Sequence, residues 1–361
     1  ILRPPRSTRF PYTTLFRSMQ ELRKDPSIGR WVIIATGRAR RPGTFIASDK
    51  SSLDPQSLKK CQFCEGNEAQ TPREVFAVRK SGSKGNMPGW SVRVIEDKAP
   101  IFKEDVSLKP KMQGLYEVLD AHGVHEIVVE SPEHVANMAD LDAKQIKHVI
   151  DAYVDRIETL EKDTSLRYVL AHKNYNWSRD NQNIPHTHSQ LIATPVIPMR
   201  VREELKGARK YYDYHERCIF CDLIKQECSD RRRIVTENDD FIALVPFASR
   251  FPFEMWILPK QHHAYFWKGV KGQEASLART LKEVLARLKE GVNDPAYHFV
   301  IHTGPFSRKK GEGSEFDTIE KDYHWHIEVI PRLTHTAGFE KGTGFYRSEE
   351  RRVGKECRSR W

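Results

Sequence analysis

Two histidines and a glutamine alternate within the segment NIPHTHSQLIATP, residues 183–195. Alternate side chains of a strand share one face, so a strand here would place His186, His188 and Gln190 side by side. An imidazole can bind a metal, carry a proton or act as a nucleophile. This segment alone leaves all three roles open.

Four of the six cysteines form two Cys-x-x-Cys pairs, CQFC at residues 61–64 and CIFC at residues 218–221. Without a secretory pattern, such pairs indicate metal binding or redox chemistry and not a disulfide framework. A redox pair usually opens a helix of a thioredoxin-like unit, whereas KKCQFCEGNE follows a polar loop. The pattern therefore favours zinc.

The order of motifs in the first half of the chain recurs in the second half. Each half has a cysteine pair, a strand followed by a histidine, a helix, a strand, and two histidines one residue apart. The first series comprises Cys61 and Cys64, HEIVVESPEH ending at His134, a helix near 141–160, RYVLAHKN, and the His186/His188 segment. The second comprises Cys218 and Cys221, FEMWILPKQH ending at His262, a helix through 277–288, YHFVIHTG, and DYHWHIEVIP with His324 and His326.

Apolar periodicity predicts the elements that position these histidines. In the helix near 141–160, apolar residues such as Ile146, Val149 and Tyr153 recur with the 3.6-residue period of a helix. The histidine strands alternate polar and apolar positions, as in an antiparallel sheet with one exposed face. We expect an α+β fold of two duplicated halves, each an antiparallel sheet with packed helices, joined by the charged helix MRVREELKGARKYYDYHER.

Each half contains the ligands of a tetrahedral zinc site, which prefers a closed shell of thiolates and imidazoles. We expect one or two zinc ions per chain. The predicted ligands are Cys61, Cys64, His134 and His186 in the first half, and Cys218, Cys221, His262 and His324 in the second.

Zinc on His186 would fix the segment and leave His188 free to react. Imidazole attacks phosphorus readily and forms a transferable phosphoramidate, and the amide of Gln190 would stabilise charge on the phosphoryl group. The alternatives are that His188 is a third metal ligand or a hydrogen-bonded strand residue.

The net charge of +10 would suit nucleic-acid binding, but it is concentrated at the two ends of the 361-residue chain. The first 18 residues contribute +4 and the last 15 contribute +3, which leaves +3 for residues 19–346. Both ends resemble translated adapter sequence, so we expect non-native segments at 1–18 and 347–361, an N-terminal half at 19–200 and a C-terminal half at 201–346. Natural basic tails, which would revive an anion-binding role, are the alternative.

No run approaches the roughly 18 apolar residues of a membrane span, and no signal-peptide pattern is present. We therefore expect a cytoplasmic protein without membrane or nucleic-acid partners.

HTHSQ resembles the HPHxQ signature of the galactose-1-phosphate uridylyltransferases, the transferase branch of the histidine-triad superfamily. CQFCEGNE, ESPEH, RARRP and HWHIEVIPR match that family in order and spacing, over nearly all of residues 19–346. The resemblance implies two histidine-triad-like halves and a ping-pong reaction in which His188 takes UMP from a UDP-sugar and passes it to a hexose 1-phosphate. It also implies a homodimer whose active sites borrow residues from the partner subunit.

The resemblance further implies roles for individual residues. Zinc would bind the four first-half ligands, and Gln190 would contact the transferred phosphoryl group. Arg38 and Arg41 match a pair that contacts nucleotide phosphates, a role that suits the planar guanidinium. Asn174 matches an asparagine near the transferred phosphate.

Two positions beside the expected phosphate site depart from the family pattern. The family has a glycine-rich loop with a serine before HxH, whereas this chain has NYNWSRDNQNIP, with Asn183 in the place of the serine. Asp97 stands where an asparagine is usual. We expect Asp97 and Asn183 among the nucleotide- and phosphate-binding residues, in an altered geometry.

The second half combines features of two branches of the family. Some members hold iron or zinc with a glutamate and three histidines, which correspond here to Glu204, His302, His324 and His326. The second cysteine pair instead resembles the branch that contains plant ADP-glucose phosphorylase. Because thiolates outcompete a carboxylate for zinc, we favour the ligands Cys218, Cys221, His262 and His324.

The choice of base and acceptor stays open. GFEKGTGFY also resembles the ADP-glucose phosphorylase branch, and Gly344 stands where galactose-specific members have a glutamate. Uridylyl transfer is the leading hypothesis. The alternatives are phosphorolysis of ADP-glucose or another nucleotide sugar, and a non-catalytic zinc-stabilised nucleotide-binding module.

Overall fold

The computed structural model describes residues 21–34, 61–176, 185–306, 316–333 and 338–348. Three residues predicted to bind phosphate, Arg38, Arg41 and Asn183, lie outside the described residues.

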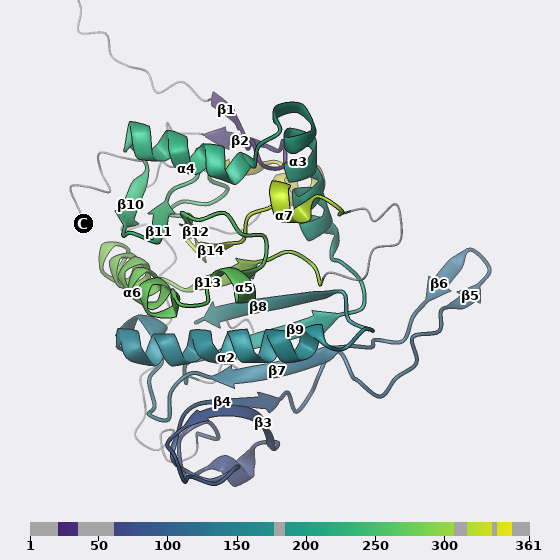
Figure 1. The fold of residues 1–361 in the computed structure, drawn as a ribbon, viewed down its shortest axis with the longest axis vertical. Coiled ribbons are helices and arrows are strands. Elements are labelled where there is room, and N and C mark those ends of the chain that lie inside the picture. The colour runs from purple at the N-terminus through teal and green to yellow at the C-terminus, as the bar shows by residue number, and fades with distance from the viewer. Residues whose placement is uncertain (1–20, 35–60, 177–184, 307–315, 334–337, 349–361) are drawn as a thin grey trace, which may run out of the picture.

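One continuous antiparallel sheet contains strands from both halves of the chain (Figure 1). The first half supplies β3 (Glu74–Arg79), β4 (Trp90–Glu96), β7 (Val124–Val129), β8 (Tyr168–Tyr175) and β9 (His188–Thr194). The second half supplies β10 (Ile234–Glu237), β11 (Phe241–Leu244), β12 (Met255–Pro259), β13 (Tyr297–His302) and β14 (His326–Pro331). The ten-stranded order is β10-β11-β12-β14-β13-β8-β9-β7-β4-β3.

The two halves of this sheet have the same topology and meet where β8 pairs with β13. If the five strands of each half are numbered along the chain, their order outward from this junction is fourth, fifth, third, second and first in both halves. The predicted α+β fold of two duplicated halves is thus confirmed, and the two sheets are joined edge to edge into one.

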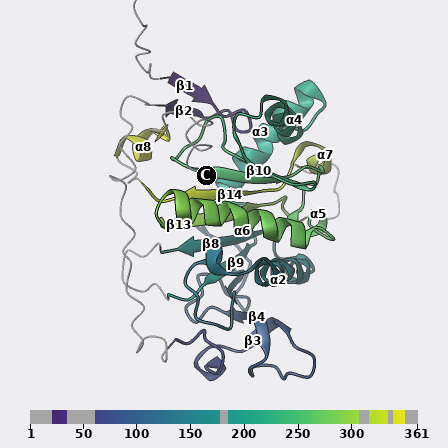
Figure 2. The ribbon, with the colours of Figure 1, turned by 90° about the vertical axis from the view of Figure 1, so that its left-hand side faces the viewer.

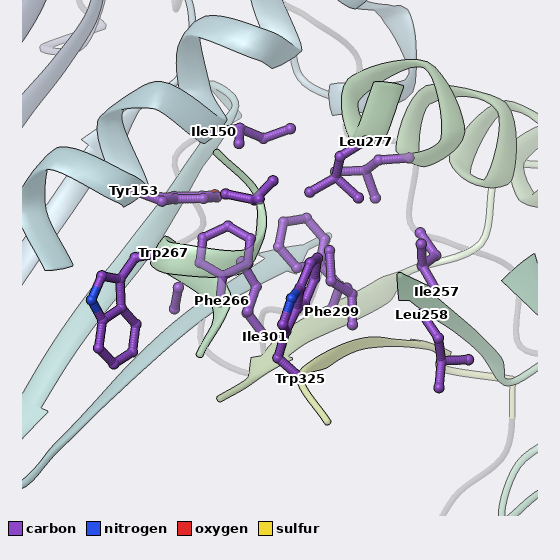
Figure 3. Close-up of a cluster of buried hydrophobic side chains, with 14 of the residues drawn as sticks. Ile150, Tyr153, Ile257, Leu258, Phe266, Trp267, Leu277, Phe299, Ile301 and Trp325 are labelled. Carbon is purple, nitrogen blue, oxygen red and sulfur yellow. The ribbon is translucent and has the colours of Figure 1, made fainter. Parts of the chain in front are cut away.

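Two long helices pack across one face of the sheet (Figure 2). α2 (Ala143–Glu161) begins where the side chain of Asp142 accepts the backbone N–H of Gln145, and α6 (Glu274–Gly291) crosses and contacts it. These helices confirm the elements predicted near 141–160 and 277–288. Their apolar faces meet the strands in the core drawn in Figure 3, with Tyr153 and Leu277 above Phe299.

The charged segment predicted to join the halves is helical. It forms α3 (Met199–His215), which is followed by α4 (Ile219–Asp230). Glu204 of α3 reaches His302 of β13, whereas Phe299 of the same strand packs toward α2 and α6. α3 therefore covers the other face of the sheet in the second half. This explains why β14 is buried throughout, so the expectation of one exposed face is wrong for β14.

The remaining elements are short. A second sheet pairs β1 (Glu21–Lys24), β2 (Trp31–Ile34) and β15 (Tyr346–Ser348), so the predicted boundary at Tyr346 falls within β15. β5 (Lys111–Gln113) and β6 (Tyr116–Val118) form a hairpin that projects to the right in Figure 1. The other short helices are η3 (Glu68–Gln70), η4 (Met138–Asp140), α5 (Phe266–Gly269), α7 (Ile319–Asp322) and α8 (Gly338–Thr343).

Within the ranges that the structure describes, every helix falls short of the length and apolar character that a membrane span requires.

Candidate active site and metal centres

The four residues predicted to bind the first zinc are brought together beside β9. The ligand atoms of Cys61, Cys64, His134 and His186 all lie within 4.8 Å of one another. β9 begins at His188, so His186 lies just before the strand. The predicted strand therefore begins at His188 and not at His186, but the two rings still lie on one side of the chain, because Phe63 packs against both, at 6.0 Å and 5.4 Å.

The dimensions of this cluster suit tetrahedral zinc. Bonds of about 2.3 Å to sulfur and about 2.0 Å to nitrogen separate the two kinds of ligand atom by about 3.5 Å in a tetrahedral site. The observed distances to Sγ of Cys64 are 3.3 Å from Nδ1 of His134 and 3.6 Å from Nδ1 of His186. Nε2 of His186 lies 2.8 Å from the carbonyl oxygen of Ser131, to which it donates, so Nδ1 is the ligating atom.

Burial sets the protonation states of two of the predicted ligands. Burial lowers the pKa of His186 to about 4, so its ring is neutral and its lone pair is available. Burial, with the neighbouring Cys61, raises the pKa of Cys64 to about 12. The Cys64 thiol therefore holds its proton, and a bound divalent metal would be needed to displace that proton and make the sulfur a ligand.

The second predicted set, Cys218, Cys221, His262 and His324, is brought together in the same way. Sγ of Cys221 lies 3.3 Å from Nδ1 of His262 and 3.6 Å from Nδ1 of His324. Each imidazole again donates from Nε2 to a backbone carbonyl, His262 to Glu320 and His324 to Pro259. Both cysteine clusters can therefore hold a metal ion, and His186 and His324 have the same kind of outer hydrogen bond.

The alternative ligand set of the second half is only partly brought together, and it is distinct from the cysteine cluster. Glu204, His302 and His326 form a third group, while His324 lies with the cysteines. His302 places Nδ1 2.9 Å from Glu204 and Nε2 3.4 Å from Glu328, and its ring stacks on His326 at 4.8 Å. The third group is thus a buried set of alternating carboxylates and imidazoles, and it can also hold a cation.

His188 presents the geometry of a nucleophile. Its Nδ1 lies 2.7 Å from the carbonyl oxygen of His186, so this nitrogen carries the proton and donates it, and Nε2 keeps its lone pair. Burial, with the positive charge of Lys173, lowers the pKa of His188. The ring is half-buried and neutral at pH 7, the form required for attack on phosphorus.

Three of the other predicted residues lie on the sheet around His188. Gln190 shares the face of His188 and hydrogen-bonds His172 on β8, whose pKa burial and the adjacent His125 lower to about 4. Asp97 lies 3.6 Å from His125 on β7, and its charge acts on His188. Asn174, two residues beyond His172, is exposed on the same face.

Two comparisons with protein families match this chain. Residues 12–198 match the N-terminal domain of galactose-1-phosphate uridyl transferase, and residues 204–338 match its C-terminal domain. Together these regions cover most of the sequence. The chain belongs to the galactose-1-phosphate uridyl transferase family. The resemblance read from the motifs is thus confirmed.

The family relatives of this chain include members with different substrates. An ADP-glucose phosphorylase from Arabidopsis thaliana is 32% identical over 329 residues, 90% of this chain and 88% of the relative. A galactose-1-phosphate uridylyltransferase from Thermotoga maritima is 26% identical over 333 residues, covering 90% and 93%. The solved structure of an Arabidopsis thaliana ADP-glucose phosphorylase with bound ADP-glucose superposes with a TM-score of 0.75, at 29% identity over 94% of this chain and 97% of that chain.

Two features of the site escaped the sequence reasoning. The ring of Phe63, inside the first cysteine pair, packs edge-on against His188 at 5.4 Å, and Phe220 of the second pair lies 4.9 Å from His326. The phenylalanine shared by CQFC and CIFC was the available signal. Lys173 and Glu130 form a fully buried ion pair beneath β9, and a charge within each apolar strand segment was the signal there.

Proposed function

We propose that this member of the family transfers a nucleoside monophosphate from a nucleotide sugar to a phosphate-bearing acceptor through a covalent adduct on His188. The observation that carries the proposal is the hydrogen bond between Nδ1 of His188 and the carbonyl of His186. That bond fixes the tautomer in which Nε2 is the free nucleophile.

The proposed reaction has two in-line displacements at one phosphorus. In the first, Nε2 of His188 forms a bond to the α-phosphorus, and the bond to the sugar 1-phosphate oxygen breaks. In the second, a phosphate oxygen of the acceptor attacks the same phosphorus and releases the imidazole. Nδ1–H stays bonded to the carbonyl of His186 and stabilises the positive charge that the ring acquires in the adduct.

Other side chains would bind the phosphoryl oxygens. The amide of Gln190 is the proposed donor on the face of His188, with Asn174 beside it and Asp97 at the edge. Arg38, Arg41 and Asn183 stay predictions for the nucleotide phosphates. Zinc on the first cluster would hold His186, and with it the carbonyl that orients the nucleophile; zinc on the second would be structural.

UMP and a hexose 1-phosphate stay the predicted group and acceptor, as in the uridylyltransferase relatives. An adenylyl transfer in which inorganic phosphate attacks ADP-glucose is the second candidate. Three observations favour it: the 32% identity to an ADP-glucose phosphorylase, the assembled Cys218/Cys221 cluster, and Gly344 in the place of a glutamate.

Steady-state kinetics with a matrix of donors and acceptors tests the proposal. UDP-glucose and ADP-glucose would each be paired with galactose 1-phosphate, glucose 1-phosphate and inorganic phosphate. A covalent adduct predicts parallel double-reciprocal lines, and the most rapid pair identifies the base and the acceptor. Intersecting lines would contradict the adduct, and nucleotide binding without turnover would support the binding-module alternative.

We also propose a homodimer, as the family resemblance implies. Light scattering of the purified protein checks the mass of the assembly. Mixing two inactive variants with substitutions at different active-site residues checks whether active sites are shared, because activity returns only if two subunits contribute to one site.

A further inference from the structure

A lysine buried beneath the catalytic strand has all three of its donors in use. Lys173 of β8 is 1% exposed, and Glu130, just after β7, is fully buried. The ammonium of Lys173 donates to the carboxylate of Glu130 at 2.6 Å, to Oγ1 of Thr187 at 2.9 Å and to the carbonyl oxygen of His188 at 2.8 Å. The hydroxyl of Thr187 in turn donates to Glu130.

This network forms hydrogen bonds with the residues on both sides of His188. Thr187 precedes His188, and Ser189 follows it with Oγ 2.6 Å from the hydroxyl of Tyr153, which also lies 3.5 Å from Glu130. Lys173 itself bonds the carbonyl of His188. The network therefore connects three consecutive residues of the chain to β7, β8 and α2.

The contact to the carbonyl falls where the pairing of β9 with β8 has ended, although β9 still pairs with β7 at His188. The register between β8 and β9 runs from Tyr168–Thr194 to His172–Gln190, two residues short of His188. Lys173 alternates with His172 and so points to the opposite face, under α2, away from the imidazole. Its ammonium thus binds the backbone of His188 from the face of the sheet opposite the imidazole. It therefore occupies none of the space that a substrate needs beside the ring.

Stability alone does not account for such a pair. Removing two charges from water costs several kcal/mol per ion, and a buried ion pair can often be replaced by uncharged residues of similar volume without loss of stability. What an ion pair with directional hydrogen bonds can provide is a fixed geometry. A displacement of about 1 Å at a reacting group costs on the order of 10²-fold in rate.

We propose that Lys173 and Glu130 are positioning residues for His188: by holding its carbonyl and the hydroxyl of Thr187, they keep Nδ1 on the carbonyl of His186 and Nε2 directed at the substrate. The inference rests on the proposed function, in which His188 is the nucleophile.

The test replaces both charges together, so that neither is left unpaired. Lys173→Met/Glu130→Gln keeps the side-chain volumes and an acceptor for Thr187. The matched control is Arg156→Met/Glu126→Gln, which removes another buried pair that links α2 to β7. We expect kcat to fall about 10²-fold in the first variant, with KM within about threefold, and kcat to stay within about threefold of wild type in the control.

A second readout follows the ring itself. In the zinc-loaded wild type with ¹⁵N-labelled histidine, His188 is expected to show one tautomer with a protected Nδ1–H, assigned by its loss in His188→Ala. The positioning role predicts mixed tautomers in Lys173→Met/Glu130→Gln and the wild-type spectrum in the control. An unchanged tautomer or an unchanged kcat in that variant overturns the proposal.

Two further provisions keep the test decisive. If the double variant does not fold, Thr187→Val removes one contact of the same network and is expected to lower kcat about tenfold; wild-type kcat there overturns the proposal. If the wild-type protein takes up no nucleotide, the proposed function fails, while the tautomer spectra, which need no substrate, still decide whether the pair orients His188.

Discussion

His188 and His326 occupy matching places in the two halves of the chain. Each follows, by two residues, a histidine that lies against a cysteine pair. Each bonds through Nδ1 to the carbonyl of that histidine, at 2.7 Å for His188 and 3.1 Å for His326. Each has a phenylalanine from the cysteine pair against its ring. The duplication has therefore preserved the local geometry that orients an imidazole.

The two imidazoles differ in what covers them. His188 is half-buried, whereas His326 is 1% exposed, stacked on His302 and 3.4 Å from Glu204 of α3. Helix α3 thus supplies a carboxylate at the nitrogen that corresponds to Nε2 of His188, the proposed nucleophile. The hydrogen bond from Nδ1 orients both rings in the same way. Only His326 is covered by α3, so only His188 is left accessible to a substrate.

Burial lowers the pKa of both His188 and His326, so the difference lies in the charges around the two rings. Burial and Lys173 lower the pKa of His188, which keeps that ring neutral. In the second half, burial alone would lower the pKa of His302, but Glu204 and Glu328 outweigh it and raise the value to about 10. The first half therefore presents a free base, and the second half contains a closed ion-pair network.

Removing each imidazole tests this comparison most strongly. We expect His188→Ala to lower kcat by about 10⁴-fold or more, because the bond-forming atom is gone, with little change in nucleotide affinity. His326→Ala should change kcat less than about threefold and lower the free energy of unfolding by about 2 kcal/mol, because it leaves a buried cavity. Equal losses of kcat in the two variants would show that the second half takes part in the chemistry.

Breaking each metal cluster should separate catalysis from stability. Cys64→Ser is expected to lower kcat on the order of 10²-fold and to lower the zinc content by one ion, because His186 and its carbonyl lose their anchor. Cys221→Ser should lower the zinc content and the melting temperature while kcat of the folded fraction stays near wild type. Zinc analysis, thermal unfolding and kinetics check both variants, and full activity in Cys64→Ser would contradict the anchoring role.

The two phenylalanines should show the same separation on a smaller scale. Phe63→Leu removes an edge contact to His188, and we expect kcat to fall about tenfold with a loss of about 1 kcal/mol in unfolding free energy. Phe220→Leu, at a fully buried position, should lower stability by a similar amount and leave kcat unchanged. The reverse pattern would assign the reactive ring to the second half.

The smallest effect concerns pH. His302 has a folded-state pKa raised to about 10, so its stabilising contribution is complete below its unfolded pKa, near 6.5, and is lost as pH rises toward 10. The melting temperature of the wild type should therefore exceed that of His302→Gln most at pH 6 and least near pH 9.5. A constant difference across this range would show that His302 is not held as a cation.

Much of this architecture could be predicted from the sequence, because the strongest sequence patterns are local. The 3.6-residue period around Ile146 and Val149 predicted α2, and the repeated order of cysteine pairs and histidines predicted the duplication and both cysteine–histidine clusters. Residues that repeat at matching places in two halves carry information that a single histidine does not.

The remaining features depend on contacts between distant segments. The joining of the two sheets at β8 and β13 depends on pairing at an edge, which no local pattern specifies. The burial of His326 depends on Glu204, more than a hundred residues earlier in the chain. The position of His186 before β9 was missed because an alternating pattern does not show where strand pairing begins.

The most direct test of the account is intact-mass analysis of the protein after exposure to UDP-glucose and, separately, to ADP-glucose. We predict that wild-type protein and His326→Ala each gain the mass of one nucleoside monophosphate, that acid removes it as expected of a phosphoramidate, and that His188→Ala gains nothing. An adduct that persists in His188→Ala, or its absence from wild type with every nucleotide sugar that supports turnover, would contradict the central claim.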